Sequence, residues 1–108
     1  MTVREFADNA ELKVLCIPSP DRTVSGAYIG DLLSWVMGRA TANCAWITIM
    51  SNVNVVAVAS LVDVSCIVLC EGVTLSDEVL NTAMAKDINV FTTDLTAYEL
   101  SQRIGSFI

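Results

Sequence analysis

Short, almost uninterrupted apolar runs alternate with segments of helical character along nearly the whole chain, and this alternation most constrains the fold. The runs at residues 12–17, 44–50, 65–70 and 88–92 have the length and composition of buried strands. Consecutive strands need a crossover before they can pair in parallel, and the helical segments between them can serve as crossovers. This alternation predicts an α/β domain with a mainly parallel sheet and helices on both faces.

Capping residues and apolar periodicity predict the helices between and around these runs. Capping-box spacings begin at Thr2 and Thr96, and Ser76 precedes two acidic residues that suit a helix N-terminus. The expected helices cover residues 3–9, 28–37, 53–62, 77–86 and 96–106. We therefore expect one three-layer domain over residues 1–108, with a mainly parallel four-stranded sheet and helices on both faces.

Two of the expected helices rest on different arguments. Residues 28–37 are apolar at positions 28, 29, 32, 33, 36 and 37, which is the spacing of one helix face, and Gly38 is placed to end this helix. The secondary structure of residues 53–62 is harder to predict, because the sequence Val-Asn-Val-Val favours a strand. A helix is preferred there because consecutive parallel strands need a crossover, and Ser51 or Asn52 can cap it.

The side chains available for chemistry argue against an enzyme. The chain has no histidine, which is the commonest general base and metal ligand. It has no glycine-rich phosphate loop, and nothing in the sequence ties either lysine to a serine nucleophile. On a strand, Cys66 and Cys70 lie about 13 Å apart, too far to share one metal ion. We expect a non-catalytic protein without a cofactor or metal.

Charge and targeting features restrict the partners and the compartment. Twelve acidic residues against six basic residues give a net charge of −6, which disfavours nucleic acid as a partner. The apolar stretch 53–70 contains Asp63, whose charge is costly inside a bilayer, so no membrane association is expected. The N-terminal residues do not resemble a secretory signal. The four cysteines are then expected to be free buried thiols of a cytoplasmic protein.

Small and polar residues mark the positions where a ligand could bind. Open parallel sheets bind ligands outside the carboxyl ends of their strands, and Arg22 is a charged donor in the loop that precedes residues 28–37. The candidate ligand-binding residues are Arg22, Thr23, Gly26, Gly30, Asp31, Ser51, Asn52, Glu71, Gly72 and Thr93. Helix capping and tight turns explain several of the same residues without a ligand, and both interpretations stay open here.

The large apolar side chains predict a core and an interface. Trp35, Met37, Trp46 and Met50 fall on core faces by periodicity. A chain of 108 residues has little area with which to cover both faces of a sheet. We therefore expect a homodimer, in contact through residues 28–37 or through a sheet edge.

Residues 21–37 have the sequence Asp-Arg-Thr-Val-Ser-Gly-Ala-Tyr-Ile-Gly-Asp-Leu-Leu-Ser-Trp-Val-Met. This stretch resembles the signature of the DRTGG domain family. Segments 46–49, 54–61 and 83–93 are similar to later blocks of that family, and the resemblance covers roughly residues 10–100. Residues 24–25 are Val-Ser, where the family pattern has a glycine pair. The resemblance implies a relation to the N-terminal domain of HPr kinase/phosphorylases, and a regulatory or associating role without agreed catalytic residues.

Together, the residues and the resemblance predict a non-catalytic regulatory module that self-associates and docks on, or regulates, a partner enzyme. A serine kinase function is rejected, because the nucleotide-binding loop of the kinase domain is missing. The alternative is a small-ligand sensor, which would bind a nucleotide or a phosphorylated metabolite near residues 21–31 and the carboxyl ends of the strands.

Overall fold

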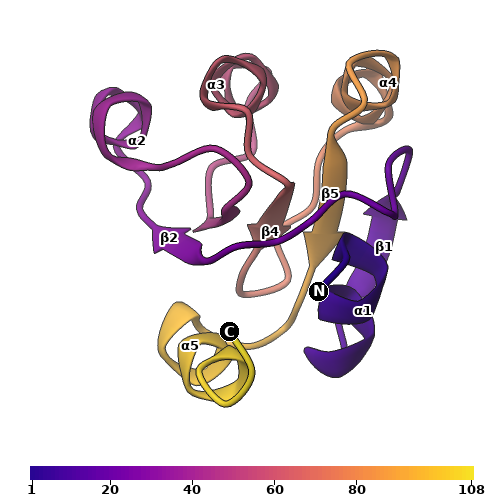
Figure 1. Ribbon diagram of the computed structural model, residues 1–108. Helices are drawn as coiled ribbons and strands as arrows, with labels where there is room; N and C mark the ends of the chain where they lie inside the picture. Colours follow the sequence, from indigo (N-terminus) through magenta and orange to yellow (C-terminus); the bar gives the residue numbers. More distant parts are fainter.

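A five-stranded sheet separates two layers of helices in the computed structural model, which describes residues 1–108 (Figure 1). The strands are β1 (Lys13–Cys16), β2 (Ala27–Ile29), β3 (Ala45–Thr48), β4 (Cys66–Leu69) and β5 (Asn89–Thr92). The helices are α1 (Val3–Asn9), α2 (Leu33–Arg39), α3 (Asn54–Val62), α4 (Asp77–Ala85) and α5 (Ala97–Ile104). The sheet order is β1-β5-β4-β3-β2, in which β2 to β5 run parallel and β1 runs antiparallel to β5.

The layers follow from the direction in which the parallel strands succeed one another. From β2 to β5 each strand is added on the same side of the last, so the right-handed crossover rule places all three connecting helices on one face. Helices α2, α3 and α4 lie on that face, and α1 and α5 lie on the other (Figure 1). The chain therefore changes face after β5, where it leaves the sheet toward α5 rather than back toward α4.

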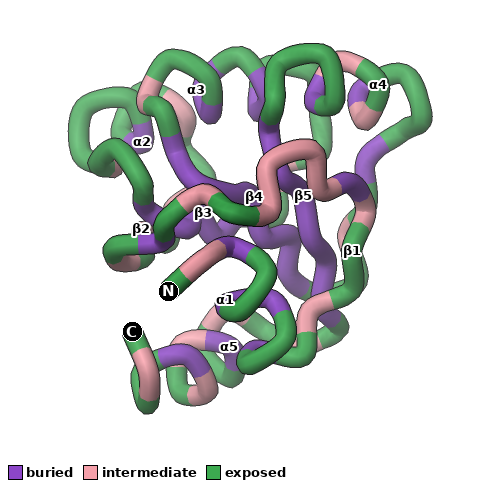
Figure 2. Tube along the Cα trace, turned by 45° about the vertical axis from the view of Figure 1, so that its right-hand side comes forward, coloured by how far each residue is buried: buried purple, intermediate pink, exposed green.

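Each face of the sheet buries its own apolar cluster, and the strands form a buried layer between them (Figure 2). Trp46 and Leu69 belong to the cluster under α2, α3 and α4, whereas Ile47 and Val68 belong to the cluster with α1 and α5. Neighbouring strand residues alternate between the two clusters, as the pleat requires. Every residue of β3, β4 and β5 is buried, which explains the long apolar runs in and around β3 and β4. In β5 the buried residues include Asn89 and Thr92, whose polar side chains are hydrogen-bonded.

The sheet has one strand more than the sequence predicts, because the start of the expected helix at residues 28–37 is extended. Strand β2 pairs in parallel with β3, and α2 begins only at Leu33. Tyr28 packs against the core while Ile29 is half exposed, so these two residues follow the period of a strand. Gly38 lies inside α2 and does not end it. The predicted fold class is confirmed with this change.

Two of the four large side chains expected in the core are exposed. Trp46 is fully buried and Met50 is partly buried, but the side chains of Trp35 and Met37 are 52% and 46% exposed. The reason is the shortened α2, whose one fully buried residue is Val36. The prediction that periodicity places Trp35 and Met37 in the core is therefore wrong.

The other predicted helices and strands are confirmed, with ends that differ by no more than two residues. The segment 53–62, where propensity favoured a strand and topology favoured a helix, forms α3. Asn52 Oδ1 accepts a hydrogen bond from the backbone N–H of Asn54 at 2.9 Å, so Asn52 orders the first turn of α3. None of the helices has both the length and the apolar character needed to cross a membrane.

Candidate functional site

The candidate ligand-binding residues do not form one site. Arg22, Thr23 and Gly26 lie on the connection from β1 to β2, which runs past the amino ends of the parallel strands. The others follow the carboxyl ends of the parallel strands β2, β3, β4 and β5. The structure therefore places the two groups at opposite edges of the sheet.

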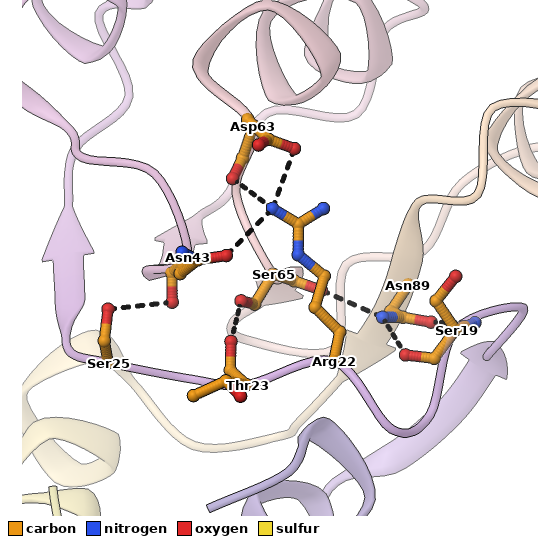
Figure 3. A network of polar contacts seen from close by, with 8 residues as sticks. All are labelled: Ser19, Arg22, Thr23, Ser25, Asn43, Asp63, Ser65 and Asn89. Atoms are coloured by element: carbon orange, nitrogen blue, oxygen red, sulfur yellow. Dashed lines mark hydrogen bonds and ion pairs between the residues drawn. The ribbon is translucent and has the colours of Figure 1, made fainter.

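The connection between β1 and β2, residues 17–26, forms a strap across the amino ends of β5, β4 and β3 (Figure 3). The side chain of Asn89 is fully buried at the start of β5. Its Oδ1 accepts from the Ser19 N–H, and its Nδ2 donates to the carbonyls of Ser19 and Ser65, each at 2.9 Å. The Ser65 hydroxyl donates to the carbonyl of Thr23. These bonds tie the strap to two neighbouring strands.

Arg22 completes the attachment of the strap. Its Nη2 donates to the Asp63 carbonyl at 2.6 Å, to Asp63 Oδ1 at 2.7 Å and to Asn43 Oδ1 at 3.1 Å. Asn43 and Asp63 have positive φ angles of 66° and 67°, and they stand in the turns before β3 and β4. Residues with short polar side chains tolerate this left-handed conformation best. Arg22 is thus engaged within the protein, and its side chain is only 23% exposed.

At the opposite edge, Gly30 and Asp31 fix the turn between β2 and α2 to the end of β3. Asp31 Oδ1 accepts hydrogen bonds from the Thr48 hydroxyl at 2.8 Å and from the Ile49 N–H at 3.0 Å. Trp46 Nε1 donates to the Gly30 carbonyl at 2.9 Å. Gly30 and Asp31, both predicted to be ligand-binding residues, thus make these hydrogen bonds to other groups of the protein.

Neighbouring connections diverge at the carboxyl ends of β4 and β5, because α4 lies on one face and α5 on the other. Open α/β sheets bind ligands at such a position. Here the two loops are joined by backbone hydrogen bonds from Glu71 to Leu95 and from Gly72 to Thr93, each at 2.9 Å. Glu71 and Gly72 therefore close the crevice between β4 and β5 instead of lining an open one.

A polar pocket is open on the other side of β5, beside the antiparallel strand β1. Because β1 runs antiparallel, its first residue, Lys13, is in register with Thr92 at the carboxyl end of β5. The pocket has a volume of about 240 Å³ and is called the Lys13 pocket below. Its lining residues are Glu11, Lys13, Thr92, Thr93, Asp94, Leu95 and Arg103. Of the residues proposed from the sequence, only Thr93 lies here.

Several polar groups of the Lys13 pocket have no partner in the protein. Arg103 Nη1 pairs with Glu11 Oε2 at 3.2 Å, but Lys13 and Asp94 make neither an ion pair nor a side-chain hydrogen bond. The Thr93 hydroxyl is nearly buried; it accepts one hydrogen bond from a backbone N–H and donates none. The pocket therefore holds uncommitted donors and acceptors of both charge signs.

Sequence reasoning does not find Lys13 and Arg103, because 89 positions separate them and their proximity depends on two tertiary facts. One fact is that β1 runs antiparallel to its neighbour, and the other is that the Arg103 side chain, from the end of α5, reaches the turn between α1 and β1, where Nη1 donates to the Ala10 carbonyl. The sequence signal that could have found this pocket is a basic residue at the first position of an edge strand. Had antiparallel pairing with β5 been predicted, Lys13 would have been placed beside the carboxyl end of β5.

A second hollow, with a volume of about 660 Å³, runs between β1 and α4 and is mostly apolar. It is lined by Val14, Leu15, Cys16, Ile17, Asp77, Leu80, Asn81 and Met84. Asp77 is the one charged side chain in this groove. The groove is wide open and forms a trough on the surface. It offers few polar groups with which to orient a small ligand.

The four cysteines are buried free thiols. Cys66 lies in β4 and Cys70 directly follows it, and both belong to the cluster with α1 and α5. Burial raises the pKa of Cys66, and burial together with the Glu71 charge raises the pKa of Cys70 to about 11. Burial also raises the pKa of Cys16 and Cys44. Because the thiolate is the reactive form, these groups are poor nucleophiles at neutral pH.

The chain matches no protein-family model and no curated protein sequence. Its fold is similar to the CBS and DRTGG domains of the regulatory region of Clostridium perfringens pyrophosphatase, a structure solved in complex with the activator diadenosine tetraphosphate. The TM-score is 0.71 at 16% sequence identity, and the match covers 95% of this chain and 45% of that one. The chain therefore spans less than half the length of this neighbour. The match shows that the chain shares its fold with a region that contains a DRTGG domain, in agreement with the fold that the resemblance of residues 21–37 implies.

Proposed function

We propose that this chain is a regulatory module that self-associates through an apolar surface beside the edge strand β2. The observation that carries this proposal is a group of large apolar side chains that remain exposed there. This β2 surface consists of Ile29, Leu32, Trp35, Ile49 and Val53, each between 46% and 59% exposed. These side chains come from segments at the β2 end of the sheet, and large exposed apolar side chains gathered in one region are typical of interaction surfaces.

The residues of the β2 surface belong to segments that are held together. The hydrogen bond from Ile49 N–H to Asp31 joins the turn after β2 to the end of β3. Ile29 is in register with Ile47, so its side chain projects to the face of α1 and α5, where it remains 48% exposed. Strand β2 is also an edge strand, whose outer backbone groups can pair with another chain.

The residue types of this region suit an interface. The Arg39 guanidinium lies 3.6 Å from the centroid of the Trp35 ring, in a cation–π arrangement. Tryptophan and arginine are the residues most enriched among those that dominate binding energy at protein interfaces. Two copies related by a two-fold axis would bring the same patch against itself, as most homodimers do.

Sedimentation velocity at micromolar protein tests self-association directly, and we expect the mass of a dimer. The variants Trp35→Glu and Ile29→Glu place a charge in the interface and should yield monomers with unchanged circular dichroism. The control Met84→Glu alters a side chain that is 48% exposed on α4, beside β1 at the opposite end of the sheet from β2, and should remain dimeric. A monomeric wild-type protein, or two charged variants that both stay dimeric, would contradict the proposal.

Ligand sensing is a second candidate function, and the Lys13 pocket is the observation that favours it. The regulatory region of the similar pyrophosphatase was solved with a dinucleotide activator, although that region is more than twice as long as the matched part. A thermal-shift panel of nucleotides tests the nucleotide form of this idea. A ligand at 100 times its dissociation constant should stabilise the fold by about 2.7 kcal/mol, and a flat panel would exclude nucleotides.

Docking on a partner enzyme, a cytoplasmic location, the lack of catalytic activity and the relation to HPr kinase/phosphorylases remain predictions from the sequence. The buried thiols of raised pKa and a structural neighbour that is itself regulatory support a non-catalytic role. Turnover of a small molecule by the purified protein would contradict it.

A further inference from the structure

We propose that the Lys13 pocket binds a small zwitterion of the α-amino-acid type at the carboxyl end of β5. This inference concerns a ligand at the β1 side of the sheet and is independent of self-association at β2. The argument rests on the position of the pocket, the charges that line it, the donors left unused there and its size.

The pocket lies next to the position that this topology favours for a ligand. The connections that leave β4 and β5 diverge to opposite faces of the sheet, which creates a binding position at their carboxyl ends. Backbone hydrogen bonds fill the space between the β4 and β5 loops. The open space next to this position is therefore on the β1 side of β5, where the Lys13 pocket lies.

The charges of the pocket suit a ligand that carries both signs. Two basic residues and two acidic residues line it, so its net charge is zero. Glu11 and Arg103 pair with each other, whereas Lys13 and Asp94 have no partner. An inorganic phosphate would satisfy Lys13 but would bring negative charge toward two carboxylates. A zwitterion places its carboxylate near Lys13 and its ammonium group near Asp94, and so pairs both charges.

Further donors in the pocket are suited to a carboxylate. Both contacts of the Arg103 guanidinium use Nη1, to Ala10 O and Glu11, and this leaves the other N–H groups uncommitted. The Thr93 hydroxyl hydrogen is unused although the residue is only 8% exposed. A buried hydroxyl normally donates as well as accepts, so this hydrogen is available for a ligand oxygen.

The size of the pocket limits the ligand. Its volume of about 240 Å³ lies below the range of about 300–1,000 Å³ that is typical of sites for drug-sized molecules. An α-amino acid is accommodated within this volume, whereas a nucleotide would extend beyond the pocket onto the surface. Leu95 is the one apolar side chain in the lining and offers a contact for a short aliphatic side chain.

Titration of the ¹⁵N-labelled protein with each proteinogenic α-amino acid, followed by NMR, tests the proposal. We expect at least one amino acid to produce saturable shifts at the amides of Lys13, Thr93 and Leu95. The N-acetyl derivative, which lacks the ammonium charge, and the matching amine, which lacks the carboxylate, should each bind about tenfold more weakly or worse. Inorganic phosphate serves as the probe for a site that recognises anions alone.

Variants of the two unpaired charges connect binding to the pocket. Lys13→Met and Asp94→Asn should each weaken binding about tenfold or more. They should leave thermal stability unchanged, because neither side chain has a partner in the protein. Lys86→Met removes the only other lysine, which follows α4 and precedes β5 at the amino edge of the sheet, and should bind as the wild type does.

Three results would overturn the proposal. One is the absence of saturable shifts with every amino acid at millimolar concentrations. Another is equal binding of phosphate or of the N-acetyl derivative, which would make the pocket a simple anion site. The third is wild-type affinity in the Lys13→Met variant. The monomeric Trp35→Glu protein should bind the amino acid normally, so a failure of the self-association proposal and a failure of this one can be told apart.

Discussion

The two edges of the sheet use polar side chains in opposite ways. At the amino edge, Asn89 and Arg22 make several hydrogen bonds each, all to groups of the protein. At the carboxyl edge beside β1, Lys13 and Asp94 make none, and the Thr93 hydroxyl donates none. A polar residue whose partners lie in the chain stabilises the fold, whereas one without partners remains available to a ligand.

This difference also clarifies what the resemblance to DRTGG domains means. Arg22 and Thr23, at the start of the signature stretch, lie on the strap and attach it to the turns before β3 and β4. The stretch continues through β2 and the turn that Asp31 fixes to β3. In this chain the signature stretch therefore forms part of the strap, strand β2 and the turn after β2. It is a better guide to the fold than to a ligand-binding site.

The largest effect is expected where the amino edge is most buried. Asn89→Ala removes three hydrogen bonds from a fully buried side chain and leaves polar groups of Ser19 and Ser65 without partners. Each such group costs about 1–3 kcal/mol, so we expect a loss of about 3 kcal/mol or more in the free energy of unfolding measured in urea. Asn81→Ala, on the exposed side of α4, should cost almost nothing. A cost for Asn89→Ala as small as that of the control would contradict the role given to the strap.

Backbone conformation predicts the next effect, at the carboxyl edge. Gly72 has a φ of 72°, and a Cβ at this position would lie 3.2 Å from Asp94 Oδ1. Gly72→Ala should therefore destabilise the protein by about 1–2 kcal/mol, mainly through the left-handed backbone. Gly38→Ala is the control, because it lies in α2 with open space around it and should stabilise the helix by about 0.5–1 kcal/mol. Thermal unfolding of both variants should show shifts of opposite sign, and shifts of equal sign would contradict this assignment.

Much of the fold could be predicted because its signals are local. Thr2 and Thr96 form the two capping boxes that their spacing indicates. The buried strands β3 and β4 lie in nearly continuous apolar runs of the sequence. Strand β2 could not be predicted in this way, because it has only three residues and its stability comes from pairing with β3. Tyr28 and Ile29 fit a helix face and a strand equally well, and only the tertiary partner decides between them.

The candidate site was less predictable, for a related reason. The rule that ligands bind at the carboxyl ends of strands led to Thr93, which does line the open pocket. The same rule led to Glu71 and Gly72, whose backbone bonds close the adjacent crevice. Whether a polar residue lines a pocket or closes one depends on which loops pair, and no spacing in the sequence encodes that pairing.

The two edges can be compared directly by removing one basic side chain from each. Arg22→Met removes three hydrogen bonds, but its partner Asp63 is 67% exposed, so solvent screens the ionic part. We expect a loss of about 1 kcal/mol in urea unfolding. Lys13→Met has no partner to lose and should stay within about 0.5 kcal/mol of the wild type. Equal effects of the two variants would remove the distinction between the edges.

The smallest expected effect is the loss of stability in acid, which should involve the amino edge and the carboxyl edge alike. The carboxyl groups of Glu5 and Glu99 accept hydrogen bonds from the backbone N–H groups of Thr2 and Thr96 at 2.8 and 3.0 Å. These bonds lower the pKa of both carboxyls below the ordinary value of 4.5. Since the native pKa is lowered, the stabilisation is present above about pH 4.5 and is lost as the pH falls through the native pKa. Both groups are fully exposed, so the change is small.

Glu5→Gln and Glu99→Gln should each remove their share of this acid-dependent stability, and urea unfolding near neutral pH and near pH 3 measures it. Their local consequences should differ. The Val3 N–H bonds to the Arg22 carbonyl at 2.8 Å, so loosening α1 should lower hydrogen-exchange protection in the strap. Loosening α5 should instead disturb Arg103 and weaken the Lys13 pocket, because that helix positions its guanidinium. A Glu99→Gln variant with reduced protection in the strap would show that the two edges are coupled and that neither role belongs to one edge alone.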